Sequence, residues 1–350
     1  MGSDPILIYG AYGYTGRLVT RQAVADGLDP IVAGRSAEKV ESVAVTHGLD
    51  HRVFTLDNPR EVADALADVA VVLNCAGPFD RTSTPLVDAC IETGTHYLDI
   101  TGEIAVFEAI ATRDSEAEAA GVMLLPGVGF DVVPTDSLAA HLADRLPDAT
   151  HLELGFQGLD ELSPGTAHTV VESLDDSGTV RRDGILVDVP VAHDIRTIDF
   201  GDGPTTAAAI HWGDVSTAYH TTGIPDVTVY ADQPEMTIRF LQLSNRLRWL
   251  LGSDPVQSAL HGLVDRFVDG PSEAARREES MYVWGRATNG EESVVSRLVT
   301  PESYLFTSHS APYLAARVRD GEAPVGFQTP ASAFGPDVAL DIDGVERTDE

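Results

Sequence analysis

The first 125 residues alternate short apolar runs with segments whose apolar residues recur every three or four positions. The runs predict buried strands, and the recurring pattern predicts amphipathic helices. The predicted strands are Ile6–Tyr9, Pro30–Ala33, Arg52–Leu56, Ala70–Asn74, His96–Ile100 and Val122–Leu125. The predicted helices are Thr15–Asp26, Ala37–His47, Pro59–Ala67, Ser83–Thr93 and Ile104–Ala120. This alternation predicts an α/β fold with a doubly wound parallel sheet.

The pattern changes after residue 150. Residues 151–157 alternate with period two, and residues 178–231 are rich in Val, Ile, Thr and Gly, which together indicate a largely antiparallel sheet. Further predicted elements are helices within 163–174 and 235–269, a hairpin over 281–299 and a last helix over 301–319. We therefore expect a second, mixed α+β domain.

Three glycines follow the first predicted strand. Gly10 permits a sharp turn, Gly13 leaves room for a pyrophosphate near the backbone, and Gly16 lets the helix lie close to the strand. The helix N-terminus then offers N–H groups and partial positive charge to phosphates. The G-x-x-G-x-x-G spacing is typical of NADP-binding domains. A glycine turn in an ordinary α/β domain could have the same sequence pattern.

The residues after the second predicted strand bear on the choice of cofactor. NAD-specific domains usually carry Asp or Glu there, whereas this chain has Arg35 and Ser36. A guanidinium can pair with the 2′-phosphate of NADP, and a hydroxyl can donate to it. We therefore predict NADP(H) rather than NAD.

Ligands of such sheets lie at the carboxyl ends of the strands. The small residues 76–78 after the fourth strand would let a ribose and nicotinamide pass, although a plain turn would also suit them. Tyr97, Asp99 and Thr101 at the fifth strand could orient a substrate or transfer a proton, as could His168 from the second domain. Thr101 or Glu103 could instead cap the next helix, and Asp131 is a further candidate acid that could also act as a cap.

The formal net charge is −32, and Lys39 is the only lysine. Because the acidic residues are spread along the chain, the charge belongs to the surface and indicates a salt-rich environment that screens self-repulsion. Nucleic acid would be repelled, so we expect no nucleic-acid partner. Two cysteines are too few for a disulfide framework or a zinc site, and we expect no metal. No apolar run approaches the roughly 20 residues of a membrane helix and no secretory signal is evident, so we expect a cytoplasmic protein.

Several motifs together resemble the saccharopine dehydrogenase-like oxidoreductases, and within them the trans-acting enoyl reductase branch, as an acidic member of haloarchaeal type. The segments that carry the resemblance are residues 10–18, 33–36, 74–79, 96–103, 126–136, 163–169, 270–278 and 329–335. The resemblance implies a Rossmann domain over residues 1–128, a substrate or dimerisation domain over 129–300, and a C-terminal segment over 301–350 that packs on the first domain. It implies NADP(H) on Gly10, Gly13, Tyr14, Thr15, Gly16, Arg35 and Ser36, with Ala76, Gly77 and Pro78 near the ribose.

The first hypothesis is an NADP(H)-dependent oxidoreductase that transfers hydride to a polarised C=C or C=O bond of a small or lipid-like molecule. The second is a non-catalytic NADP-binding sensor or partner protein. The third is an amino-acid-linked dehydrogenase of the saccharopine type. An enzyme of that type needs arginines to bind the carboxylates of its substrates. In the middle domain only the adjacent pair Arg181 and Arg182 is a candidate for this role. The β-rich middle could pair two copies of the chain as a homodimer.

Overall fold

The computed structural model describes residues 5–158, 177–244, 253–267, 279–322 and 324–350. The chain forms two compact units. Unit 1 comprises Met1–Val133 with Tyr304–Ile342, and unit 2 comprises Pro134–Ser303 with Asp343–Glu350. Each unit therefore takes in a segment from near the C-terminus.

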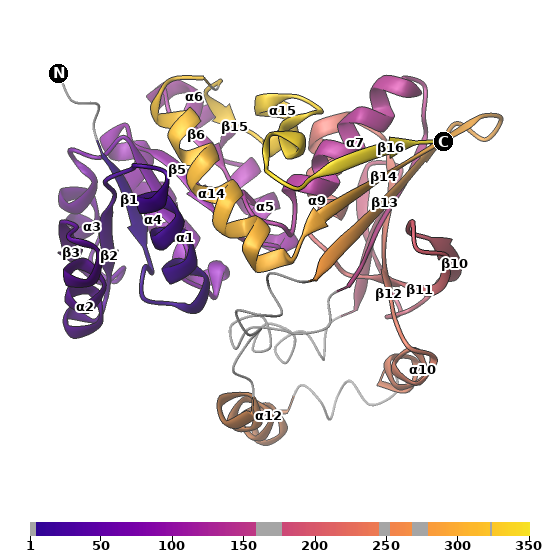
Figure 1. Ribbon diagram of the computed structural model, residues 1–350, viewed down its shortest axis with the longest axis horizontal. Helices are drawn as coiled ribbons and strands as arrows, with labels where there is room; N and C mark the ends of the chain where they lie inside the picture. The colour runs from indigo at the N-terminus through magenta and orange to yellow at the C-terminus, as the bar shows by residue number, and fades with distance from the viewer. Residues whose placement is uncertain (1–4, 159–176, 245–252, 268–278, 323) are drawn as a thin grey trace. The chain divides into compact units, whose positions relative to one another are not determined.

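Unit 1 contains a seven-stranded sheet in which every pair of neighbouring strands is parallel. Its strand order is β15-β6-β5-β4-β1-β2-β3. The strands are β1 (Ile6–Tyr9), β2 (Ile31–Gly34), β3 (His51–Val53), β4 (Val71–Asn74), β5 (His96–Asp99), β6 (Met123–Leu125) and β15 (Gly326–Phe327). The chain runs outward from β1 to β3 and then crosses back to β4, so the order reverses between β1 and β4 (Figure 1). This topology confirms the predicted doubly wound α/β fold.

Helices connect the strands of this sheet. They are α1 (Tyr14–Ala25), α2 (Ala37–His47), α3 (Pro59–Leu66), α4 (Phe79–Thr93), α5 (Ile104–Ala111) and α6 (Asp114–Ala120). Contacts link α1 with α2, and they link α4 with α3, α5 and α6. Right-handed crossovers that leave β1 and β4 in opposite directions place these two groups on opposite faces of the sheet.

Two helices differ from their predicted extents. The segment predicted as one helix over 104–120 is two helices, and Arg113 between them has φ −93° and ψ 4°, outside the helical region. The Arg113 side chain pairs with Asp88 and Glu116, which fixes this break. Helix α4 begins at Phe79, four residues before the predicted Ser83, and its start is stabilised by a side chain from another loop, described below.

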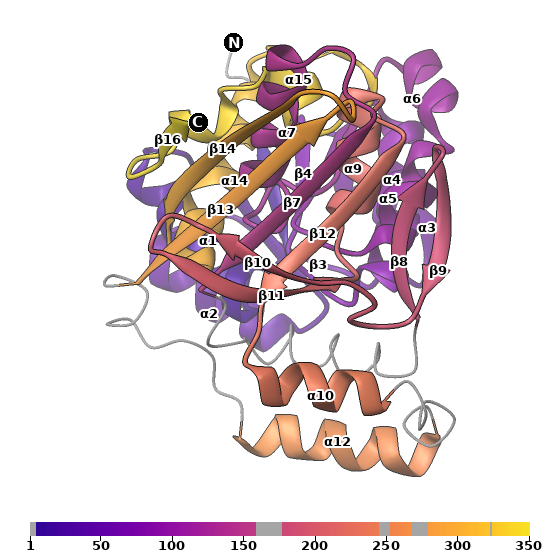
Figure 2. The same cartoon turned by 90° about the vertical axis from the view of Figure 1, so that its right-hand side faces the viewer.

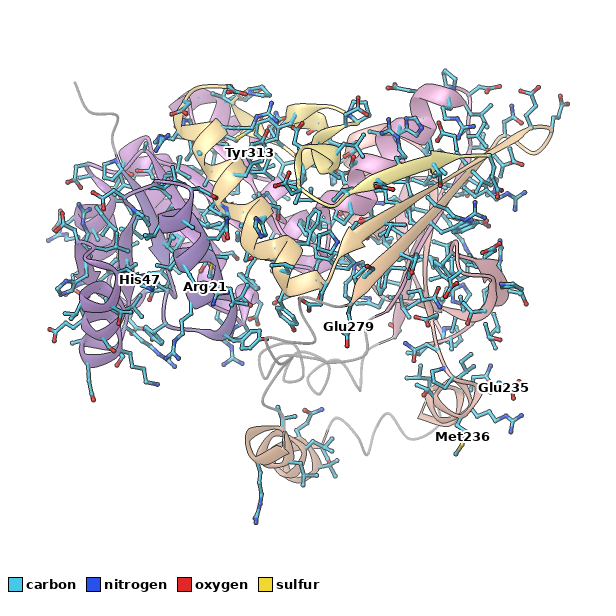
Figure 3. The ribbon with its side chains drawn as sticks, viewed as in Figure 1. Arg21, His47, Glu235, Met236, Glu279 and Tyr313 are labelled. Carbon is cyan, nitrogen blue, oxygen red and sulfur yellow. The ribbon has the colours of Figure 1, made fainter. Side chains whose placement is uncertain are left out.

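A C-terminal segment completes unit 1. It comprises α14 (Ser303–Arg319), the strand β15, α15 (Pro330–Phe334) and the short 3₁₀ helix η2 (Val338–Asp341). The strand β15 adds to the sheet edge beside β6, with Phe327 opposite Leu124. Tyr313, labelled in Figure 3, lies on α14, and its hydroxyl donates to Asp341 Oδ2 at 3.0 Å, which ties η2 to the helix.

Unit 2 is built on a mixed, mostly antiparallel sheet (Figure 2). Its main path is β10-β11-β12-β7-β13-β14-β16, and β8 and β9 extend it from β12. The strands are β7 (His151–Gln157), β8 (Gly178–Arg182), β9 (Ile185–Val189), β10 (Ile195–Asp199), β11 (Pro204–Ile210), β12 (Asp226–Asp232), β13 (Ser280–Thr288), β14 (Ser293–Pro301) and β16 (Glu346–Asp349). The pair β12–β7 is parallel, so the prediction of a second mixed domain is confirmed.

The described helices of unit 2 are α7 (Val133–Arg145), α9 (Asp214–Thr222), α10 (Glu235–Ser244) and α12 (Asp254–Phe267). Helix α7 lies on the sheet at Gly285, where an added Cβ would stand 2.6 Å from Leu142 Cδ1. Helix α9 lies within residues 178–231, for which the sequence pattern indicated a largely antiparallel sheet and no helix was predicted. Within the described ranges, no helix combines the length and the apolar character needed to cross a membrane.

Candidate functional site

The glycine turn lies at the point where the strand order of unit 1 reverses. It leaves the carboxyl end of β1, and the loop Cys75–Pro78 leaves the carboxyl end of the neighbouring β4. Ligands of open parallel sheets bind at this reversal, outside the carboxyl ends of the strands. The topology therefore identifies these two loops as the walls of the candidate site.

Gly10 and Gly16 are required by packing within the turn. Gly10 has φ +81°, and an added Cβ would stand 2.8 Å from Ala76 Cβ in the loop after β4. A Cβ on Gly16 would stand 2.2 Å from the carbonyl oxygen of Gly10, so only glycine lets α1 approach the strand this closely. The positive φ of Gly10 agrees with the sharp turn predicted there, and the contact at Gly16 agrees with the close approach of helix and strand predicted for that residue.

Gly13 differs from the other two glycines. A Cβ added there would meet only backbone oxygens, the nearer being that of Gly10 at 3.3 Å. Gly13 is the N-cap residue of α1 and has no side chain of its own with which to cap the helix. The start of α1 thus presents backbone at a helix N-terminus, which suits a pyrophosphate. Tyr14 and Thr15 in its first turn are half-buried and can still be reached.

A second group of residues follows β2. Arg35 is exposed, and among the described residues its guanidinium makes no hydrogen bond or ion pair. Ser36 is the N-cap residue of α2, but its hydroxyl makes no capping bond. Arg35 and Ser36 therefore have the accessibility and chemistry that a 2′-phosphate requires.

Two residues that the sequence reasoning did not select complete this group. The ring of Tyr12 packs on Gly34, where an added Cβ would stand 2.6 Å from Tyr12 Cε1. The Lys39 ammonium lies 5.6 Å from the centroid of the same ring. The signal available in the sequence was that the only lysine stands four residues after Arg35, at the start of the next predicted helix.

The loop after β4 is held by hydrogen bonds from Asn74 and Thr82. Asn74 Oδ1 accepts from Ala76 N at 3.0 Å, and Thr82 Oγ1 donates to Ala76 O at 2.6 Å. Asn74 Nδ2 donates to Thr82 Oγ1 at 3.1 Å, which closes the ring of contacts. Ala76 and Pro78 are half-buried and Gly77 is exposed, so the loop can be reached from outside.

The residues predicted at the end of β5 lie together but inside the unit. Tyr97, Asp99 and Thr101 are each 0% exposed. The Tyr97 hydroxyl donates to Asp99 Oδ2 at 2.7 Å, and Asp99 Oδ1 accepts from Thr101 N at 3.0 Å and from Gly127 N at 2.9 Å. The pKa of the Asp99 carboxyl is raised to about 6, and burial is the largest cause of this shift. These contacts join the ends of β5 and β6 and favour a positioning role for the three residues.

Glu103 makes a contact that was not predicted. It stands at the N-cap position of α5 but does not cap that helix. Its Oε1 accepts from Phe79 N at 3.0 Å and its Oε2 from Asp80 N at 3.1 Å. The carboxylate thus caps the neighbouring α4, because β4 and β5 are adjacent and their following loops meet. Thr101 Oγ1 accepts from Glu103 N at 3.1 Å and orients this residue.

Other candidates have structural contacts or fall outside the described ranges. His168 lies outside the described residues. Arg181 in unit 2 is 4% exposed, donates to the carbonyls of Val215 and Gly184, and stacks on Tyr219. Burial raises the pKa of the Cys75 thiol to about 12, which makes it an inert core residue. Among the residues that the structure describes, no group of three or more His, Cys, Asp or Glu side chains could hold a metal ion.

Comparison with known proteins identifies the domain that carries this site. Residues 6–125 match the family model described as the saccharopine dehydrogenase NADP binding domain. The human saccharopine dehydrogenase-like oxidoreductase is 32% identical over 151 residues, covering 37% of this chain and 35% of that protein. The trans-acting enoyl reductase of Mycobacterium leprae (strain TN) is 36% identical over 139 residues, covering 37% and 33%. The matches thus span about a third of these relatives.

A solved structure extends the likeness to the whole chain. The apo saccharopine dehydrogenase (L-Glu forming) of Saccharomyces cerevisiae aligns with a TM-score of 0.67 and 12% identity, covering 99% of this chain and all of that one. At this identity the match shows a shared fold. The comparisons confirm the resemblance that the sequence motifs indicated. Residues 6–125 are thus similar to the saccharopine dehydrogenase NADP-binding domain, and this similarity indicates that the Rossmann unit binds NADP(H).

Proposed function

We propose that the protein is an NADPH-dependent reductase of a polarised C=C or C=O bond in a small or lipid-like molecule. The observation that carries the proposal is the pairing of two features at one sheet edge. A glycine turn, whose N-cap residue has no side chain of its own, opens α1, and the guanidinium that follows β2 pairs with no side chain in the part of the chain that the structure describes. A pyrophosphate and a 2′-phosphate are the groups that such features bind.

The proposed cofactor contacts follow from these features. The backbone of Gly10, Gly13 and Gly16, with the first turn of α1 at Tyr14 and Thr15, would hold the pyrophosphate. Arg35 and Ser36 would hold the 2′-phosphate, with Lys39 as a second cation nearby. Ala76, Gly77 and Pro78 would lie beside the ribose. When bound, the reduced nicotinamide supplies a hydride, and the protein must orient the acceptor, exclude water and provide a proton.

The choice of a C=C or C=O acceptor rests on the likeness to relatives that include trans-acting enoyl reductases. The amino-acid-linked alternative loses the support that Arg181 offered, because that guanidinium is engaged by backbone carbonyls within unit 2. The cytoplasmic setting, the homodimer and the division into parts at residues 128 and 300 stay predictions.

The test is a two-stage assay in concentrated salt. Titration with NADPH and NADH should give tighter binding of NADPH. A panel of enoyl and keto compounds, as free acids, thioesters and isoprenoids, should then include at least one that oxidises NADPH. Binding without turnover across the panel would instead support the sensor hypothesis, and preferential binding of NADH would contradict the assignment of Arg35.

A further inference from the structure

The reaction proposed above needs a proton donor that can reach the substrate, and several polar groups at the sheet edge do not meet that need. Asp99 and Thr101 are fully buried and hydrogen bonded within the unit. Glu103 has its two carboxylate oxygens on the first N–H groups of α4. An acid that gives a proton must come within hydrogen-bond reach of the accepting atom.

Asp131 is less deeply buried than Asp99 and Thr101. It stands in the turn that follows β6, beside the loop after β5, at the same carboxyl edge of the sheet as the glycine turn. The residue is half-buried rather than fully enclosed. In doubly wound sheets the ligand extends along this edge from the point of strand reversal. From the reversal between β1 and β4, the strands β4, β5 and β6 follow in that order. Asp131 therefore lies on the β6 side of the candidate site.

The fold makes room for this carboxyl group. A Cβ added to Gly102 would stand 3.0 Å from Asp131 Oδ2 and 3.3 Å from its Cγ. The absence of a side chain at Gly102 thus creates the space in which the carboxyl lies. Gly127 N and Val128 N both donate to Asp99, so the two loops that face each other here are joined at their bases.

The turn that carries Asp131 is also held rigidly. Phe130 N donates to Thr307 Oγ1 at 2.9 Å, and Ser310 Oγ donates to Val128 O at 2.8 Å, both from α14. Phe130 packs edge-on against Phe306 of the same helix, with ring centroids 6.0 Å apart. A donor held in this way keeps its geometry through a reaction.

The surroundings of Asp131 suit a proton donor near neutral pH. Burial raises the pKa of its carboxyl from the usual 3.8 to about 7. The titratable groups on the facing β5 loop are Asp99 and Glu103, and both accept backbone N–H bonds. Thr307 and Ser310 of α14, which are hydrogen bonded to the turn, contribute hydroxyl groups. A general acid works best when its pKa lies near the working pH.

We propose that Asp131 is the general acid that completes the reduction. This inference rests on the proposed function. One carbon of the polarised double bond accepts hydride from NADPH, the π electron pair moves to the other atom, and that atom takes the proton of the Asp131 carboxyl. The products are NADP⁺, the saturated or hydroxyl product and the Asp131 carboxylate, which regains its proton from water.

The test compares the whole wild-type chain with Asp131→Asn in concentrated salt. Asp131→Asn should bind NADPH as tightly as wild type and lose about 100-fold or more in kcat, the usual contribution of acid catalysis. The wild-type kcat should fall as pH rises through about 7, because the protonated acid is the active form, and the residual rate of the variant should lack this fall. Asp29→Asn makes the same chemical change at an exposed carboxylate and should behave as wild type.

A measurement that does not depend on activity completes the design. In ¹³C NMR of the apoprotein, one carboxyl signal absent from Asp131→Asn should titrate with a midpoint near 7. A midpoint near 4, or an active variant with an unchanged pH profile, would overturn the role of Asp131 while leaving the reductase assignment intact. A wild-type protein that binds NADPH but reduces nothing would overturn both. If Asp131→Asn does not fold, Gly102→Ala, which crowds the carboxyl from the facing loop, should lower kcat with Asp131 still present.

Discussion

Gly16 and Gly10 are in such close contact that a Cβ on Gly16 would stand 2.2 Å from the Gly10 carbonyl oxygen. The Gly10 carbonyl oxygen is a backbone atom, so it cannot move away from an added Cβ as the end of a flexible side chain could. Gly16→Ala should therefore displace α1 from β1, cost about 1–3 kcal/mol in the free energy of unfolding, and weaken NADPH binding as well. Denaturant unfolding of the apoprotein and a cofactor titration measure the two effects.

Gly13→Ala is the matched comparison, because it tests phosphate approach with little packing cost. Its added Cβ would stand 3.3 Å from the same oxygen, and the backbone of Gly13, at φ −66°, suits alanine. We expect a smaller loss of stability than for Gly16→Ala but an NADPH affinity lowered at least as much. Equal losses of stability with unchanged affinity for Gly13→Ala would contradict the role of this residue beside the pyrophosphate.

Arg35 should set the preference for NADPH over NADH. Hydrogen bonds to charged groups contribute about 1.5–3 kcal/mol, which corresponds to roughly 10- to 150-fold in affinity. Arg35→Ala should lose that factor for NADPH and leave the affinity for NADH nearly unchanged. Arg60→Ala removes an exposed arginine from α3 and should change neither. A parallel loss for both cofactors would show that Arg35 supports the turn rather than the 2′-phosphate.

Glu103 should stabilise the start of α4 and, through it, the loop at 76–78. Glutamine offers one acceptor oxygen in place of two and no charge toward the helix N-terminus, so Glu103→Gln should cost about 1 kcal/mol in the free energy of unfolding. Thermal or denaturant unfolding checks this. Glu92→Gln, at an exposed position near the end of the same helix, should stay within about 0.5 kcal/mol of wild type. A loss no larger than that of Glu92→Gln would contradict the capping role.

The linkage between pH and stability gives a separate prediction for Asp131. Its pKa in the folded state is about 7 against 3.8 in the unfolded chain, so the folded state holds the proton more tightly. Its contribution to stability is fully present below about pH 4 and is lost as the pH rises through about 7, a difference of up to about 4 kcal/mol. Urea unfolding from pH 4 to 8 in concentrated salt should therefore show Asp131→Asn equal to wild type at the acid end and more stable at the basic end.

Asp99 does not interfere with that comparison. Its pKa is also raised, to about 6, but Asp99 is present in both proteins and its contribution cancels in the difference. A difference between the two proteins that stays constant with pH would contradict the raised pKa of Asp131. A variant that is more stable yet less active would match the trade-off expected when a protein keeps a destabilising buried carboxylate for its function.

The sequence pattern predicted the turns, strands and helices that are determined by residues close together in the chain. The β1–Gly10–α1 turn, the strand β4 and the helix α2 were found because short apolar runs and glycine spacing are local signals. Contacts across loops were not predictable in this way. Glu103 caps α4 across 23 residues, and Thr307 fixes the turn at Phe130 across 177. Tyr12 and Lys39 were missed because their role appears only when the ring packs on Gly34.

The negative surface should make folding depend on salt. With a net charge of −32, like charges repel over about 10 Å in 0.1 M salt and over about 3 Å in 1 M salt. The melting temperature should therefore rise between dilute buffer and molar KCl. The triple variant Asp29→Asn, Glu92→Gln and Glu118→Gln neutralises three exposed carboxylates and should melt higher in dilute buffer and respond less to salt. If salt acted only because it is excluded from the protein surface, it would raise the melting temperatures of the wild type and the triple variant equally. A wild-type melting temperature that does not change with salt would contradict the prediction.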